Sequence, residues 1–205
     1  MVNEQASTGK NFRVPKKTRH LPGEEGVWVF ILGDMMVFSL FFLVFTYYRG
    51  QAPELFANSQ ATLNFNYAAI NTLLLLTSSW FVALGLHAVR CNKPLLASRL
   101  LVLAGGCGLG FAGVKLLEYG EKIRAGYILT TNDFYMYYYI FTGIHFLHLI
   151  IGMVVLIFLW SKCKKLRLAG KTTASDIQTF ESGAAYWHMV DLLWIVLFPL
   201  IYLVK

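Results

Sequence analysis

Seven ionisable side chains lie inside or at the edge of long apolar stretches of this 205-residue sequence. They are Asp34, Lys115, Glu118, His145, His148, His188 and Asp191. Carboxylates and imidazoles in such stretches can share protons, bind a metal ion or join helices through hydrogen bonds. Because an ionisable group is costly in hydrocarbon, each of these residues is a candidate functional residue.

The spacing of these residues indicates which of them share a helix face. His145 and His148 are three residues apart, His188 and Asp191 are also three apart, and Glu181 lies seven residues before His188. On a helix each of these separations places the side chains on one face. At about 1.5 Å per residue, the aspartates of the first and last apolar stretches lie roughly 10–15 Å from one end of their helices. We therefore predict a buried polar layer that joins the first, fourth and fifth stretches.

Two interpretations of this layer are open: hydrogen bonds that fix the register of the helices, or a proton relay or metal site. We favour the first, because a polar pair between membrane helices contributes about 0.6–2 kcal/mol. Five histidines are too few for two haems and a copper ion, and the three cysteines form no Cys-x-x-Cys pair. We therefore expect no metal and no catalytic residue in this chain. A zinc site is kept as the lesser alternative, with His145, His148 and His188 as its ligands.

Composition indicates which elements position these residues. The chain is 57% apolar and 14% charged, whereas soluble domains are about 45–50% apolar and about 25% charged. Five apolar stretches reach the roughly 20 residues that cross a bilayer, and hydrocarbon requires their backbones to be helical. We predict an all-α integral membrane bundle of five transmembrane helices. Its spans are approximately Val27–Tyr48, Ala68–Val89, Ser98–Leu117, Tyr135–Trp160 and Ala184–Val204.

The Lys and Arg residues predict the orientation of this bundle. Thirteen of them fall in the N-terminal segment and in the second and fourth connections, against four on the other side. Since basic loops stay in the cytoplasm, we expect a cytoplasmic N-terminus and an external C-terminus. Residues 1–25 are then a cytoplasmic tail, and residues 26–205 are the transmembrane domain. The net charge of +7 is thus a topology signal with scope for anionic lipid contacts, and we expect no nucleic-acid partner.

A stripe of small residues marks one face of the third span. Gly106, Gly110 and Gly113 are spaced four and then three residues apart. Such a stripe lets helix backbones approach closely. Packing within the chain and contact with another subunit are both open interpretations.

Four segments resemble the cytochrome c oxidase subunit III family. Residues 186–194 read YWHMVDLLW and resemble its signature YWHFVD-x-x-W. Residues 142–152 read TGIHFLHLIIG and resemble TGFHGxHVxxG, whereas residues 30–38, FILGDMMVF, resemble FxxSExMFF. Glu118 and Tyr119 match the end of its QxxEY motif. The resemblance covers most of residues 22–205.

The sequence departs from the family pattern at two positions, and it resembles one branch of the family in particular. Asp34 stands where the family usually has Glu, and Lys115 stands where it has Gln. The shorter Asp34 side chain puts the family's membrane carboxylate role in doubt here. The chain resembles the short five-span bacterial form, and residues 20–28, HLPGEEGVW, look most like the NorE-type branch, whose members are encoded alongside nitric oxide reductase.

The resemblance implies a non-catalytic accessory subunit of a haem–copper oxidase complex, either a cytochrome oxidase or a nitric oxide reductase. Such a subunit packs against the catalytic subunit I, which holds the haem and copper, and binds phospholipid in a cleft between its helices. It supports assembly, proton uptake and stability in the bacterial plasma membrane. The resemblance also implies two spans on one side of the lipid cleft and three on the other. Glu118 and Glu181 are then carboxylates at the membrane edge.

The alternative to this reading is an independent small transporter or proton channel that uses the polar layer as its pathway. The sequence contains no inverted repeats or broken helices, which are typical of such transporters. We therefore expect the accessory-subunit function.

Overall fold

The computed structural model describes residues 23–204 of the chain. Six α-helices and a final π-helical turn follow one another, and the described residues contain no strand. Their bounds are α1 Glu25–Gln51, α2 Pro53–Ala61, α3 Phe65–Arg90, α4 Pro94–Arg124, α5 Asp133–Ala169, α6 Ala174–Phe198 and η1 Pro199–Leu203. Residues 1–22, most of the predicted cytoplasmic tail, lie outside the described part of the chain.

Five of these helices are long and apolar enough to cross a membrane. They correspond in order to the five predicted spans, so the predicted fold class is confirmed. Each is longer than the apolar stretch from which it was predicted; α5 in particular extends from Asp133 to Ala169. The short helix α2 was not predicted, because its nine residues include the polar side chains of Glu54, Asn58 and Gln60.

The ends of the helices are fixed by the residue types that cap helices elsewhere. Asn132 accepts a hydrogen bond from the backbone N–H of Tyr135 at the start of α5. Thr173 and Asp176 form a reciprocal capping box at the start of α6, which satisfies two N–H groups that the helix leaves unpaired. Gly170 ends α5 with a φ of +69°, a left-handed conformation that glycine adopts without strain.

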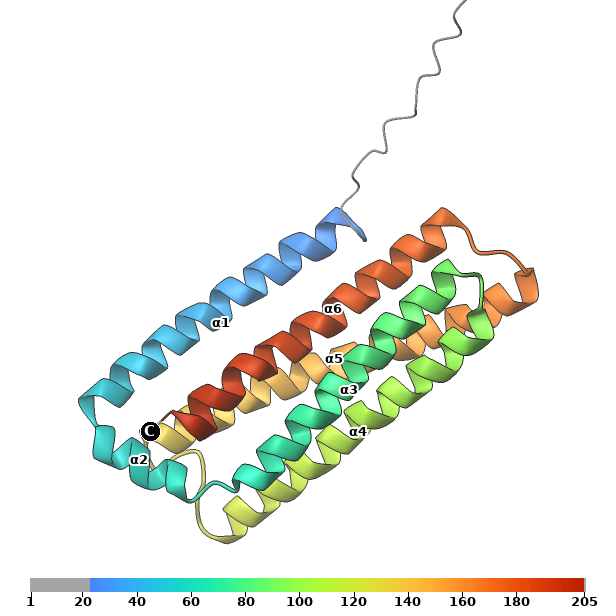
Figure 1. Cartoon of the computed structure of the whole chain (residues 1–205). Helices are drawn as coiled ribbons and strands as arrows, with labels where there is room; N and C mark the ends of the chain where they lie inside the picture. The colour runs from blue at the N-terminus through green and yellow to red at the C-terminus, as the bar shows by residue number, and fades with distance from the viewer. Residues whose placement is uncertain (1–22, 205) are drawn as a thin grey trace, which may run out of the picture.

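In the bundle α6 packs against α3 and α5, and α4 packs against the same two helices (Figure 1). At the α3–α4 contact, the Ser78 hydroxyl donates to the Ala104 carbonyl over 2.9 Å. The site of a Gly110 Cβ lies only 3.4 Å from Leu74. The expected division of the spans into the first two and the last three is therefore wrong. The second span, α3, packs on α4 and α6 because small residues let those helices approach closely.

Helix α1 lies along the outside of this bundle and contacts α6 and α2 (Figure 1). Its N-terminus is attached to α6 by hydrogen bonds. The Gly23 N–H donates to Glu181 over 3.0 Å, and the Glu24 N–H donates to Ser182 over 2.9 Å. Most of the α1 side chains face outward, including those of Leu32, Met36 and Leu43. Helix α1 is therefore a peripheral helix whose N-terminus is attached to α6 by these hydrogen bonds.

The glycines that allow the closest packing are not those of the predicted stripe. Gly110 does pack against α3, but a Cβ at Gly106 or Gly113 would have no neighbour within 4 Å. The buried ring of Trp187 instead lies against Gly108 of α4 and Gly152 of α5, where an added Cβ would come 3.1 and 2.9 Å from it. The stripe is thus divided between internal packing and the outer surface.

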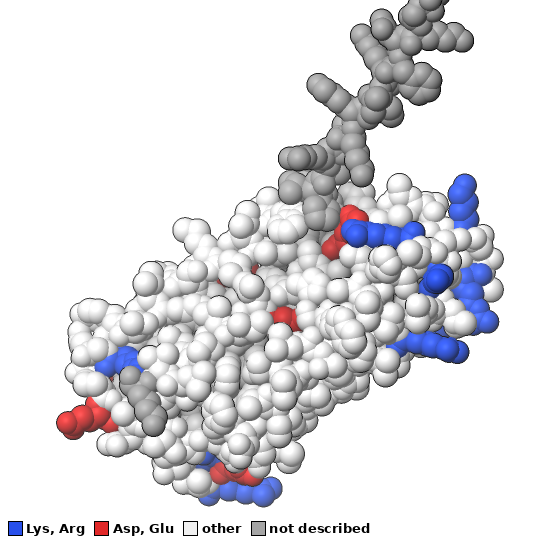
Figure 2. Space-filling view, in the orientation of Figure 1, with Lys and Arg blue, Asp and Glu red and all other residues white. Residues whose placement is uncertain are grey.

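Charged side chains lie mainly at the ends of the bundle, and its middle is largely uncharged apart from a small patch of acidic atoms (Figure 2). Most Lys and Arg residues on this face gather at the end where α3 and α5 finish and α4 and α6 begin. This is the end that the basic-residue bias predicts to be cytoplasmic.

Candidate functional site

The two residues that join α1 to α5 in the middle of the bundle are Asp34 and His148. His148 Nε2 lies 3.1 Å from Asp34 Oδ2, and both side chains are largely buried. The other ring nitrogen, Nδ1, lies 2.8 Å from the Ile144 carbonyl oxygen. Since a carbonyl can only accept, Nδ1 carries a hydrogen. Nε2 faces the carboxylate at ion-pair distance, although the two groups do not meet in hydrogen-bond geometry.

A second polar group lies where α6 faces α3. The Ser79 hydroxyl is 2.6 Å from His188 Nδ1, and Asp191 Oδ2 is 4.0 Å from the same nitrogen. A hydrolytic Ser–His–Asp relay needs the serine and the carboxylate on opposite ring nitrogens. Here both are on Nδ1, so the group is a hydrogen-bonded contact between helices rather than an activated nucleophile.

His145 is separate from both of these groups. It is fully buried, and its ring packs between Phe111 and Trp194 at centroid distances of 5.6 and 5.3 Å. Neither ring nitrogen has a hydrogen-bond partner among the described residues. The predicted single polar layer is thus resolved into one α1–α5 pair, one α3–α6 group and the separate imidazole of His145.

The histidines do not form the alternative zinc site. Within residues 23–204, no three His, Cys, Asp or Glu side chains converge in a way that could hold a metal ion. His148 turns toward Asp34, and His188 turns toward Ser79. His145 is enclosed by aromatic rings. Three imidazoles on two helices therefore do not make a ligand set, although their spacing permits one.

A buried ion pair lies on the C-terminal half of α4, away from the basic end of the bundle where α4 begins. Lys115 Nζ lies 2.9 Å from Glu118 Oε2, and both side chains are almost completely buried. Lys115 also donates to the hydroxyls of Tyr138 and Tyr202 over 3.2 and 2.9 Å. The Tyr202 hydroxyl donates in turn to Glu118 Oε1 over 2.7 Å. The network connects α4, α5 and η1, and every charged group in it has a partner.

Sequence reasoning identified Lys115 and Glu118 and expected Glu118 at the membrane edge, but it missed both tyrosines. The separation of three residues on one helix predicts the Lys–Glu pair. Nothing in the local sequence indicates Tyr202, because η1 reaches α4 only through the tertiary fold. The related Tyr119–Thr142 hydroxyl contact of 2.6 Å was missed for the same reason.

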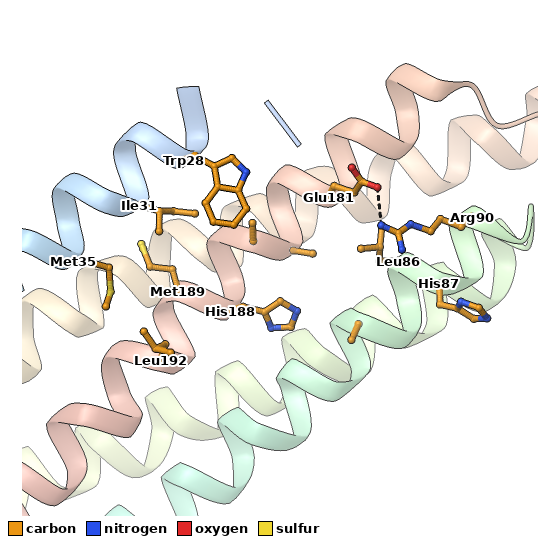
Figure 3. A pocket seen from close by; sticks show the side chains of 13 residues that line it. Trp28, Ile31, Met35, Leu86, His87, Arg90, Glu181, His188, Met189 and Leu192 are labelled. Carbon is orange, nitrogen blue, oxygen red and sulfur yellow. Dashed lines mark hydrogen bonds and ion pairs between the residues drawn. The ribbon is translucent and has the colours of Figure 1, made fainter. Parts of the chain in front are cut away.

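Glu181 and His188 line a cavity of about 550 Å³ between α1, α3 and α6 (Figure 3). Glu181 Oε1 forms an ion pair with Arg90 over 2.7 Å at one end of the cavity. Trp28 and Met35 face the cavity from α1, and the His188 ring faces it from α6. Its walls are mostly apolar, with one charged pair at the end. The predicted shared face of Glu181 and His188 is present.

Together these features define a class: a multi-pass helical membrane protein whose intramembrane polar residues form contacts between helices. Comparison with known proteins then identifies its family. The profile of "Cytochrome c oxidase subunit III" matches residues 11–205, and the chain belongs to this family. The membership makes it a multi-pass protein of the bacterial plasma membrane.

Three relatives show the range of similarity. The chain is 29% identical to "Cytochrome c oxidase subunit 3" of Synechocystis sp., over 87% of this chain and 74% of that one. It is 28% identical to "Quinol oxidase subunit 3" of Bacillus spizizenii, over 87% and 85%. It is 27% identical to "Heme-copper oxidase subunit I+III" of Aeropyrum pernix, over 87% of this chain and 22% of that much longer one. The predicted family is confirmed.

Proposed function

We propose that this chain is a non-catalytic accessory subunit that packs on the catalytic subunit I of a haem–copper oxidase. The observation that carries the proposal is the family match along nearly the whole chain. The Aeropyrum pernix relative, named as subunits I and III together, supports subunit I as the partner. Haem and copper would then belong to that partner, because His148 and His188 are engaged in helix contacts and His145 is enclosed by aromatic rings.

The oxygen-reducing oxidases are the favoured partners, since the similar proteins are named cytochrome c or quinol oxidase subunits. A nitric oxide reductase is the second candidate, and the resemblance of residues 20–28 to the NorE-type branch supports it. Both partners would use the chain in the same way, to stabilise the catalytic subunit and to support its proton uptake.

Membrane phospholipid is the proposed ligand of the 550 Å³ cavity between α1, α3 and α6. Its apolar walls suit an acyl chain, and the Arg90–Glu181 pair at its end suits a zwitterionic headgroup.

The alternative function, a transporter or proton channel, has less support. The Asp34–His148 pair and the Ser79–His188 contact are separate groups rather than one continuous polar pathway.

Purification of the native complex in mild detergent tests the proposed function. We expect a haem-containing catalytic subunit to co-purify with this chain, and its identity decides between oxygen and nitric oxide as the substrate. Deletion of the chain should reduce turnover of the complex without abolishing it. Complete loss of turnover in a deletion complex with full haem and copper content would argue for a direct chemical role.

A further inference from the structure

A second groove lies on the outer surface between α4 and α5, apart from the cavity of Figure 3. It has a volume of about 430 Å³, and its walls are apolar side chains and glycine. Gly105 and Gly106 provide its depth, because a Cβ at Gly106 would have no neighbour within 4 Å and one at Gly105 would approach only the Met153 methyl group. Val102 and Leu109 line the α4 side, and Trp160 lines the α5 side.

Two cations stand at the end of this groove. The Lys164 ammonium lies 3.5 Å from the ring centroid of Trp160, one turn away along α5. On α4, Arg99 is exposed and precedes Val102 by three residues, which places it on the same helix face as Val102 and Gly106. Because α4 and α5 run in opposite directions, both cations lie at the same end of the groove, which is the basic end of the bundle (Figure 2).

Neither of these two cations has an acidic partner among the described residues; Lys93 and Lys165 at the same end also lack one, but they do not line the groove. At the same end of the bundle, Arg90 pairs with Glu181 and Lys162 pairs with Asp176. Among the described residues, no Asp or Glu oxygen lies within 4.0 Å of the charged group of Arg99 or Lys164. The positive charge at the groove is therefore available for an anion from outside the chain.

We propose that the α4–α5 groove binds an anionic phospholipid of the membrane leaflet at the basic end. Its phosphate lies between Arg99 and Lys164, and one acyl chain runs along Gly105 and Gly106. Basic pockets between transmembrane helices recognise anionic headgroups in this way, and Trp160 lies at the depth where indole rings favour the headgroup boundary. From Val102 to Leu109 the groove follows α4 for about 10 Å, a length that suits the upper half of an acyl chain.

Charge complementarity favours lipid over a neighbouring protein helix. The groove is apolar along its length and cationic at one end only, which matches an amphiphile with a single anionic head. This inference does not depend on which catalytic subunit the chain accompanies. A protein helix seated in the groove is therefore an outcome of the test rather than part of the proposal.

The test uses the purified complex in nanodiscs of phosphatidylcholine with 10% or 30% phosphatidylglycerol, followed by native mass spectrometry of the lipids retained on this chain. The double variant Arg99→Gln with Lys164→Gln should retain at least tenfold less phosphatidylglycerol than the unaltered complex. The matched control, Lys93→Gln with Lys165→Gln, removes two cations from the same end and should retain the normal amount.

A second variant tests the acyl-chain part of the groove without altering charge. Gly106→Leu fills open space rather than a packed contact, so the chain should fold and yet lose the retained lipid. Equal retention of phosphatidylglycerol by all of these variants would overturn the proposal. So would a density map of the complex in which a helix of another subunit occupies the groove.

Discussion

Asp34 and His148 form the polar contact by which the peripheral helix α1 is attached to α5 in the middle of the bundle. Their closest atoms, Oδ2 and Nε2, are 3.1 Å apart, and the Nδ1 bond to the Ile144 carbonyl fixes the orientation of the imidazole. This arrangement makes the two residues a single energetic unit.

Replacement of either member of this pair should therefore destabilise the chain. Asp34→Ala and His148→Phe should each lower the free energy of unfolding by about 1–3 kcal/mol, because each leaves a buried polar group without its partner. The double variant should lose less than the sum of the two. Unfolding of the purified chain by SDS in mixed micelles measures this, and strictly additive losses would show that the two residues act independently.

Removal of the cation from the buried Lys115–Glu118 pair should have a larger effect. Lys115→Met leaves the Glu118 carboxylate buried with only the Tyr202 hydroxyl as a partner, and breaking a buried pair in this way costs about 3–5 kcal/mol. The double variant Lys115→Met with Glu118→Met removes both charges and should be more stable than Lys115→Met alone. The same SDS unfolding measurement decides this, and a double variant less stable than the single one would contradict the expectation.

The close packing of the Trp187 ring predicts which glycine of α5 tolerates a side chain. Gly152→Ala places a Cβ 2.9 Å from the Trp187 ring, and overpacking of this kind costs about 1–3 kcal/mol. Gly143→Ala, nine residues earlier on α5, meets no atom within 4 Å and serves as the matched control. Thermal unfolding should separate the two variants, with Gly143→Ala at or above the stability of the unaltered chain because alanine favours the helix. Equal stability of the two variants would show that the Trp187 ring moves aside for the added Cβ at little cost.

The capping box of α6 supplies a prediction outside the hydrocarbon. Thr173→Ala removes the hydroxyl that accepts from the Asp176 N–H, and loss of such a cap costs about 0.5–2 kcal/mol. Thr173→Ser keeps the hydroxyl and should remain close to the unaltered chain. Hydrogen exchange of the first-turn amides should be faster in Thr173→Ala alone, and equal exchange in both variants would show that the cap is dispensable.

The sequence was sufficient to predict the spans and the family. Long apolar runs have only one solution in hydrocarbon, which is a helix, and the motifs around His145 and His188 are specific to one family. The shared face of Glu181 and His188 also followed from local spacing, because residues seven apart on a helix lie above one another.

The partners across helices could not be predicted in this way. Ser79 of α3, rather than a residue of the first or fourth span, meets His188. Asp191, a member of the predicted polar layer, has His188 at 4.0 Å and no hydrogen bond among the described residues. Periodicity gives the face of each helix but not its rotation against a neighbour. That rotation depends on contacts such as Trp187 on Gly152, which no local pattern encodes.

The position of α1 has a consequence for the synthesis of the chain. This helix enters the bilayer first, yet the residues that hold it, His148 on α5 and Glu181 and Ser182 on α6, are made last. Until they emerge, Asp34 remains in the membrane without its imidazole, a costly state. A nascent chain that stops before α5 therefore carries a carboxyl group in hydrocarbon without its imidazole partner, which distinguishes unfinished molecules from complete ones.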